Sequence, residues 1–147
     1  MARLDTRLES EAAEFLVLGH LLLARIWAYK TYVNMPGFDI VATSPECGTS
    51  ARIQVKSRFH SGAEGFPIKA FDCDFVIFVG LNRGRVKSSR GVADPEYFVL
   101  PVDVVRPLMR VSGGWPKVLL RDIPNLDEYR NNWALVAEHL GVRPATR

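Results

Sequence analysis

The sequence has few of the residues that build zinc sites or disulfide frameworks. It contains two cysteines, Cys47 and Cys73, and three histidines, and neither set matches a zinc-ligand spacing. Residues 1–14 are charged and lack the apolar run of a secretory segment, so we expect a cytoplasmic protein whose two cysteines are reduced and buried. The longest apolar stretch, residues 15–23, is too short to span a bilayer.

The composition also lacks the marks of a disordered or repetitive chain. Apolar residues make up 48% of the 147 residues, which is enough for one hydrophobic core. The formal net charge of +3 is mildly basic and is compatible with a polyanionic partner. We therefore expect a single domain over residues 1–147, in which the placement of the charges says more about function than their sum.

Hydrophobic periodicity predicts a helix at each end of the chain. Apolar residues at helical spacing predict a long first helix over residues 4–29, whose centre is apolar nearly all round. The same spacing predicts an amphipathic helix over residues 125–140, which Asn125 caps, with Glu128 completing a capping box.

The segments between these helices read mainly as strands. Strands are expected at 38–43, 51–59, 74–81 and 97–102, a short helix at 103–110 and a further strand at 117–122. This order predicts a mixed α/β fold, a central mixed sheet flanked by helices. Its core covers about residues 11–102, and a helical extension covers about 103–141.

Polar side chains are concentrated in the predicted hairpin, residues 37–58. Asp39 opens its first strand, and Gln54 and Lys56 lie two apart in its second. Side chains at i and i+2 of a strand point to one face, so Gln54, Lys56 and Arg58 share a face. An acid, an amide and an amine then converge, which suits a hard cation and an attacking water. The alternative is a half-buried hairpin with a polar outer face.

With the element order added, this pattern resembles the PD-(D/E)XK nuclease superfamily. The matching residues are Glu14 in the first helix, Asp39 in PGFDIVA, and Gln54 and Lys56 in RIQVKSR, followed by the apolar strand DFVIFVGL. The resemblance covers about residues 11–82. It is greatest to branches with glutamine at the third position, such as Mrr-like restriction enzymes and small resolvase-like or homing-type nucleases. It implies a restriction-endonuclease-like core.

The resemblance also implies a role for each residue in metal-dependent DNA cleavage. Asp39 is expected to be the central ligand of Mg²⁺ or Mn²⁺. The backbone carbonyl of Val55 and the amide oxygen of Gln54 are expected to contribute further contacts. Lys56 is expected to orient the attacking water and help to activate it.

The chemistry of magnesium calls for a second carboxylate, because Gln54 carries no charge. Protein-bound Mg²⁺ is usually held by one or two carboxylates together with substrate phosphate and water. Glu14 is the best candidate, since its helix directly precedes the hairpin. Glu11, one helical turn away, is the second choice, and Glu46, in the turn between the strands, is the third. Near two carboxylates Lys56 stays charged, which suits it to transition-state charge and water positioning.

Basic residues in two loops are expected to contact DNA phosphates, which are recognised without regard to sequence. A run without acids lies between residues 83 and 90. The alternative for this run is a solvated loop. The expected DNA-contacting set is Arg58, His60, Lys69, Arg83, Arg85, Lys87 and Arg90.

Three functional hypotheses remain open. The first is a Mg²⁺-dependent DNA endonuclease, and the second is a catalytically weak or inactive DNA-binding or assembly protein on a nuclease fold. The third is an unrelated α/β protein in which Asp39 caps a turn, Lys56 is solvated and Glu14 complements the helix dipole. A nuclease that cuts two strands commonly pairs, and the apolar first helix is either a homodimer surface or buried within the monomer.

Overall fold

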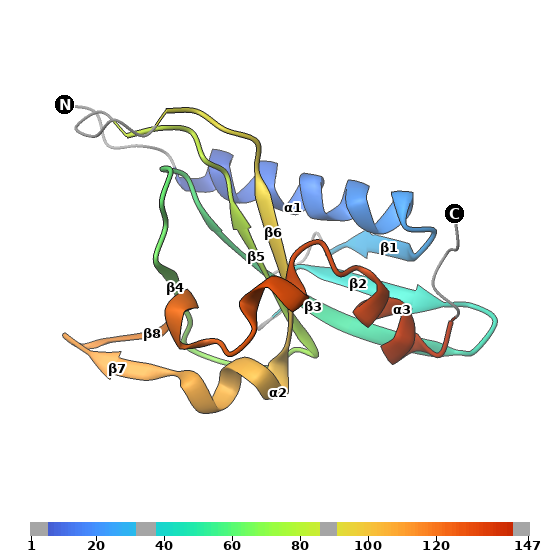
Figure 1. The fold of residues 1–147 in the computed structure, drawn as a ribbon. Helices are drawn as coiled ribbons and strands as arrows, with labels where there is room; N and C mark the ends of the chain where they lie inside the picture. Colours follow the sequence, from blue (N-terminus) through green and yellow to red (C-terminus); the bar gives the residue numbers. More distant parts are fainter. Residues whose placement is uncertain (1–5, 32–37, 86–90, 143–147) are drawn as a thin grey trace.

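The computed structural model describes residues 6–31, 38–85 and 91–142, and its centre is a five-stranded sheet in the order β1-β2-β3-β5-β6 (Figure 1). Its strands are β1 (Trp27–Lys30), β2 (Ile40–Ser44), β3 (Thr49–Arg58), β5 (Phe75–Gly80) and β6 (Glu96–Pro101). Strand β3 pairs antiparallel with β2 and parallel with β5. The predicted fold class, a mixed central sheet with helices, is confirmed.

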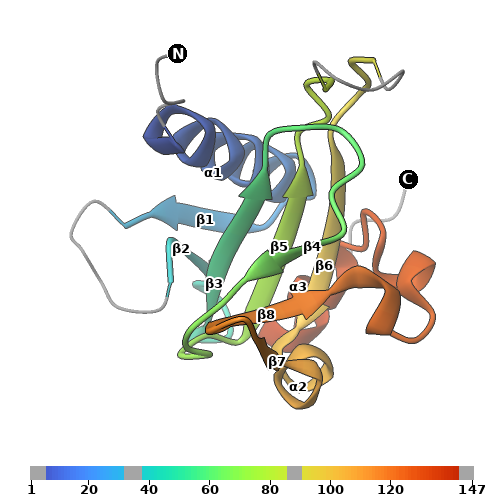
Figure 2. The same ribbon diagram turned by 90° about the vertical axis from the view of Figure 1, so that its left-hand side faces the viewer.

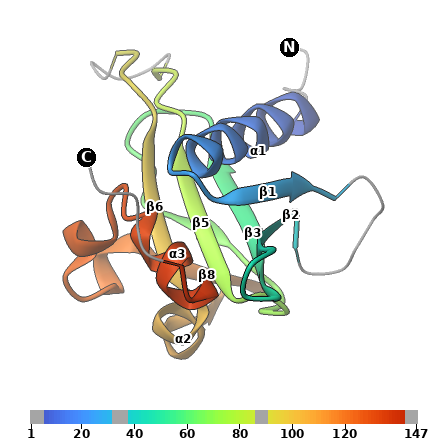
Figure 3. The ribbon, with the colours of Figure 1, turned by 90° about the vertical axis from the view of Figure 1, so that its right-hand side faces the viewer.

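Two helices cover one face of this sheet. In helix α1 (Thr6–Leu23), Ala13, Val17 and Leu21 recur every fourth residue and are fully buried. They share a core with the inward residues of the sheet and with helix α3 (Ala134–Leu140). Burying a side chain such as Leu21 stabilises the fold by about 1.5–3 kcal/mol. Figure 3 shows α1 and α3 in front of the sheet.

A second, three-stranded sheet covers the opposite face, as Figure 2 shows. It has the order β4-β8-β7 and consists of β4 (Gly65–Pro67), β8 (Trp115–Leu119) and β7 (Arg110–Ser112). A Cβ atom on Gly65 would lie 2.2 Å from the Val118 carbonyl oxygen, so only glycine allows β4 and β8 to approach this closely. Phe66, Phe78 and Phe98 stack in the core between the two sheets.

The first helix is shorter than predicted, and the prediction of helix over residues 24–29 is wrong. Arg25 has a φ of 66°, and the Ile26 N–H donates to the Leu21 carbonyl while the Arg25 N–H donates to that of Leu22. This is a Schellman motif, in which buried Ile26 also packs in the same core as Leu21. Glycine usually occupies the left-handed position of that motif, so Arg25 concealed the helix end. Strand β1 follows.

The C-terminal helix is also not continuous, and the predicted capping box is wrong. A short 3-10 helix, η3 (Leu126–Tyr129), is separated from α3 by extended backbone at Arg130. Asn125 has a φ of 54° and makes no side-chain cap. Arg130 interrupts the helix because it forms a β-bridge with Phe98 and an ion pair with Glu96 at 2.9 Å.

The predicted helical extension over 103–141 contains strands β7 and β8 as well as helices. The short helix expected at 103–110 is α2 (Val102–Val105) followed by the 3-10 helix η1 (Arg106–Leu108). The strand expected at 117–122 is β8, which begins earlier and leads into the 3-10 helix η2 (Leu120–Asp122). None of the helices in the described ranges is long and apolar enough to cross a membrane.

Both cysteines are free, but they differ in exposure. Cys73 is buried as expected, whereas Cys47 is exposed, so the expectation that both are buried is wrong. Cys47 lies in the turn between β2 and β3, where no core exists to cover it.

Candidate active site

Asp39 lies one residue before β2, at the edge of β3. Its backbone N–H donates to the Ile53 carbonyl at 2.8 Å, and its own carbonyl accepts from the Thr31 N–H at 2.9 Å. Strand β2 begins only at Ile40, so the Asp39 carboxylate takes the place of a strand partner for β3. Asp39 Oδ2 accepts the Val55 N–H at 2.8 Å. Burial raises the pKa of Asp39, while the Val55 N–H and the charge of Lys56 oppose that rise.

Glu14 points inward from α1, where it meets a buried lysine. Lys30, the last residue of β1, places Nζ 2.6 Å from Glu11 Oε2 and 3.7 Å from Glu14 Oε1. The exposed fractions of the side chains are 3% for Lys30, 15% for Glu14 and 57% for Glu11. Of the two helical glutamates considered from the sequence, Glu14 is therefore the enclosed one.

The electrostatics of Glu14 show that it lies near Asp39. Burial, followed by the negative charge of Asp39, raises the pKa of Glu14 to about 7, although the Lys30 ammonium acts in the opposite direction. Glu46, the third candidate, is exposed in the turn at the other end of β2. The charge of Asp39 thus acts on Glu14, the helical glutamate that the sequence favours.

The alternation predicted along β3 is confirmed by its register with β5. Gln54 lies opposite Val76 and Lys56 opposite Phe78, on the face covered by the second sheet, whereas Ile53 faces α1. Burial lowers the pKa of Lys56, and the negative charge of Asp39 opposes that change. Lys56 and Asp39 are therefore electrostatic neighbours.

The Gln54 side-chain amide and the Val55 backbone carbonyl each offer a neutral oxygen, and the two oxygens have different neighbours. The N–H and C=O of one strand residue point to the same edge, so the Val55 carbonyl shares the edge at which Asp39 lies. The Gln54 amide oxygen accepts a weak hydrogen bond from Cys73 Sγ at 3.9 Å. Its amide is thus turned toward β5 rather than toward Asp39.

The donor set fits a hard divalent cation. No group of three or more His, Cys, Asp or Glu side chains that could hold a metal occurs within residues 6–31, 38–85 and 91–142. The set is instead two carboxylates, Glu14 and Asp39, with neutral oxygens nearby, and this is the usual protein contribution to Mg²⁺. A dication beside both carboxylates would also relieve the repulsion that helps to raise the pKa of Glu14.

The basic residues expected to contact DNA differ in whether their side chains are already engaged in hydrogen bonds within the protein. Arg58, His60 and Lys69 are exposed. Arg83 holds its own loop together, since Nε donates to the Leu81 carbonyl at 2.9 Å and Nη2 to that of Ala93 at 2.6 Å. Arg85 is exposed and donates from Nε to the Ser61 carbonyl at 2.6 Å. Lys87 and Arg90 lie outside the described residues.

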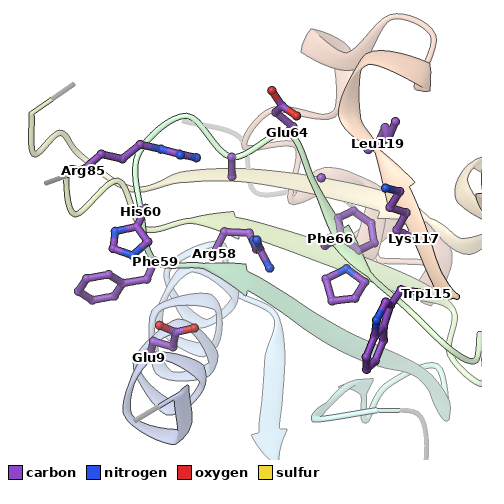
Figure 4. A pocket seen from close by; sticks show the side chains of 13 residues that line it. Glu9, Arg58, Phe59, His60, Glu64, Phe66, Arg85, Trp115, Lys117 and Leu119 are labelled. Carbon is purple, nitrogen blue, oxygen red and sulfur yellow. The ribbon is translucent and has the colours of Figure 1, made fainter. Parts of the chain in front are cut away.

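A cavity of about 770 Å³ opens beside the end of β3 (Figure 4). It was not predicted, and neither were two of its residues, Trp115 and Lys117 of β8. The sequence signal that could have found them is SGGWPK, a two-glycine turn followed by alternating aromatic and basic residues. Lys30 was missed because residues 27–29 were assigned to the end of the first helix and Lys30 to the connection after it. The residues lining the cavity are Glu9, Arg58, Phe59, His60, Ala63, Glu64, Gly65, Phe66, Pro67, Arg85, Trp115, Lys117 and Leu119.

The mixed α/β fold, with its five-stranded mixed sheet, matches that of a solved nuclease structure. The structure is similar to that of the bacterial homing endonuclease I-Ssp6803I, with a TM-score of 0.60 and 20% sequence identity over 93% of this chain and 94% of that one. Hjc, a Holliday junction resolvase from the hyperthermophilic archaeon Archaeoglobus fulgidus, gives a TM-score of 0.47 and 16% identity over 86% of this chain and 97% of that one. No family model and no curated protein matches the sequence.

Proposed function

We propose that the protein is a metal-dependent DNA endonuclease that hydrolyses phosphodiester bonds at Glu14, Asp39, Gln54 and Lys56. One observation carries this proposal. Asp39, at the start of β2, interacts electrostatically with residues of two other elements: its charge helps to raise the pKa of Glu14 in α1 and opposes the lowering of the pKa of Lys56 in β3. Two half-buried acids and a half-buried amine in one region are costly unless they serve a purpose.

Each residue has a task in this proposal. Bound Mg²⁺ or Mn²⁺ would supply charge stabilisation and a water of lowered pKa. Glu14, Asp39 and the Val55 carbonyl would hold it, and the Gln54 amide oxygen would join them on turning away from Cys73. The Lys56 ammonium would donate hydrogen bonds to the attacking water and to a phosphate oxygen.

Lys30 is a positioning residue in this arrangement. Its ammonium is buried between Glu11 and Glu14 and lies 4.1 Å from the centroid of the Phe15 ring. An ion pair of this kind restricts the rotamers of Glu14 and lowers its pKa against the effect of burial. Lys30 thereby helps to keep a carboxylate available for a cation near neutral pH.

The proposed substrate is DNA, which the basic residues named above would hold by its phosphates. We also propose a homodimer, because two strands require two active sites. The candidate surface is the apolar side of α1 and β1, where Leu23 is 78% exposed, Leu22 47% and Trp27 60%. A cytoplasmic location remains an expectation from the sequence.

A second candidate function is DNA binding or assembly without efficient cleavage. Two observations favour it: Lys30 already neutralises part of the charge of Glu11 and Glu14, and the Gln54 amide is engaged by Cys73. Both reduce what the site offers to a cation.

Nicking of supercoiled plasmid and of branched DNA separates the two functions. We expect nicking with Mg²⁺ or Mn²⁺ and none with EDTA, and we expect Asp39→Ala and Lys56→Ala each to abolish it. Asp74→Asn is a matched control, because Asp74 Oδ2 accepts a backbone N–H, that of Arg52, at 2.8 Å, as Asp39 does from Val55. Nicking that survives both alanine changes would refute the endonuclease site, and salt-dependent binding without nicking would favour the second function.

A further inference from the structure

The cavity beside β3 has an uneven distribution of charge. It is lined by Arg58, Arg85 and Lys117, by His60, and by two acids, Glu9 and Glu64. Neither Arg58 nor Lys117 has a side-chain hydrogen bond or ion pair within the described part of the chain. Continuous duplex phosphate would meet both acids, so the cavity is better suited to a ligand that offers an anion and a hydrogen-bond donor at once.

Trp115 adds an aromatic face to the cavity. It is 63% exposed and follows the turn Gly113–Gly114, whose φ values of 64° and 83° fix a tight hairpin between β7 and β8. Figure 4 shows its ring at one end of the cavity, with His60 and Phe59 at the other. The Lys69 ammonium lies 5.6 Å from the Trp115 ring centroid. An exposed tryptophan held by a hairpin and paired with cations is typical of surfaces that stack nucleobases.

The far end of the cavity is held by hydrogen bonds, so it exists before any ligand binds. Ser61 is 5% exposed, and its Oγ accepts the Gly84 N–H at 2.8 Å and donates to the Gly91 carbonyl at 2.9 Å. His60 Nδ1 lies 3.1 Å from the Gly84 carbonyl, which can only accept, so Nδ1 carries the proton and Nε2 is free for a ligand. Together with the bond from Arg85 Nε to the Ser61 carbonyl, these bonds hold the loop that carries His60 against the loop that carries Arg85.

The two acids that line the cavity, Glu9 and Glu64, can accept hydrogen bonds from a nucleobase. Among the described residues Glu9 Oε2 is buried without a hydrogen-bond partner, and Glu64 is exposed at the same cavity. The amino groups of cytosine N4 and adenine N6 donate to carboxylates. In duplex DNA one N–H of each amino group is used in the base pair, whereas in an unpaired nucleotide both are free.

We propose that this cavity binds an unpaired nucleotide of the DNA strand, with its base on Trp115 and its phosphates at Arg58, Arg85 and Lys117. The inference deepens the proposed function, on which it rests, by naming the substrate class as DNA with an unpaired base. The cavity adjoins the candidate active site, since Arg58 lies two residues beyond Lys56 on one face of β3 and the charge of Lys69 lowers the pKa of Lys56. Its volume of about 770 Å³ lies within the range of small-ligand sites, about 300–1,000 Å³.

Fluorescence anisotropy in EDTA tests the proposal without any cleavage. The probes are one labelled single strand, the matching duplex, and that duplex with one unpaired base. Base stacking on an aromatic ring is worth about 1–3 kcal/mol, so we expect Trp115→Ala to weaken binding of the first and third probes by about 5- to 150-fold. Trp115→Phe should retain most of the affinity. Val111→Ala is the control, because Val111 is 71% exposed on β7 of the same sheet and does not line the cavity.

Two results would overturn the proposal. One is unchanged affinity of Trp115→Ala for all three probes, and the other is an equal loss for all three, which would make the surface a duplex-phosphate contact. The proposed endonuclease fails separately, since Asp39→Ala is expected to bind the unpaired-base probe as the wild type does. If the wild-type protein bound this probe but nicked DNA with neither Mg²⁺ nor Mn²⁺, the nuclease would be refuted and the nucleotide cavity would stand.

Discussion

At the scale of residues, the position of Glu14 was predictable and its partner was not. Placing a glutamate on the helix before the hairpin needed only the motif and the chemistry of magnesium. The sequence ranks Glu14 above Glu11, but it does not give their side-chain exposures of 15% and 57%, which depend on how α1 rotates against the sheet. Lys30 could not be predicted, because its inward direction follows from strand alternation in a segment whose sequence favours helix.

In the metal-free protein, Glu14→Gln is expected to raise the melting temperature relative to the wild type by more at pH 8 than at pH 5. The pKa of Glu14 is raised from 4.5 to about 7, so the fold disfavours its ionised form. In the wild type, the stability that depends on protonation of Glu14 is therefore fully present below pH 4.5. It is lost as the pH rises through about 7. Thermal unfolding at the two pH values measures the difference, which we expect to amount to a few degrees.

The control for this comparison is Glu46→Gln, since Glu46 is exposed in the turn between β2 and β3. Its melting temperature should follow that of the wild type at both pH values. An offset for Glu14→Gln that is the same at pH 5 and pH 8 would show that Glu14 ionises normally in the fold.

At the scale of elements, the strands were predictable and the helix ends were not. Alternation placed Gln54 and Lys56 together, and the apolar run DFVIFVGL identified the buried β5. The end of α1 depends on Arg25 in a left-handed conformation, and the break before α3 depends on the contact of Arg130 with Phe98. Both are tertiary effects that outweigh local propensity.

Ser61→Ala is expected to loosen the two loops that meet beside the cavity. The change leaves the part-buried Gly84 N–H without its acceptor and the exposed Gly91 carbonyl without its donor. A lost hydrogen bond of this kind costs about 0.5–1.5 kcal/mol, which urea denaturation would measure as a loss in the free energy of unfolding.

Ser57→Ala serves as the matched control for that change. Ser57 is half-buried on β3, and no side-chain hydrogen bond engages it within the described ranges. Its free energy of unfolding should change by less than that of Ser61→Ala. Equal losses for the two variants would mean that the Ser61 bonds do not hold the loops.

At the scale of the whole molecule, the two faces of the central sheet have different tasks. Helix α1 supplies Glu14 from one face, and the second sheet encloses Lys56 and supplies Trp115 from the other. The sequence indicated the first face because the motif includes a glutamate on the helix before the hairpin. It did not predict the second, since β4 and β8 are distant in the chain and their close approach requires glycine at position 65.

The central claim is that a divalent cation binds at Asp39 and Glu14, and anomalous diffraction from crystals soaked in Mn²⁺ tests it most directly. The account predicts an anomalous peak in contact with both carboxylates, and its loss in crystals of Asp39→Asn. Crystals without a peak at Asp39, under solution conditions in which the protein nicks DNA, would contradict the account.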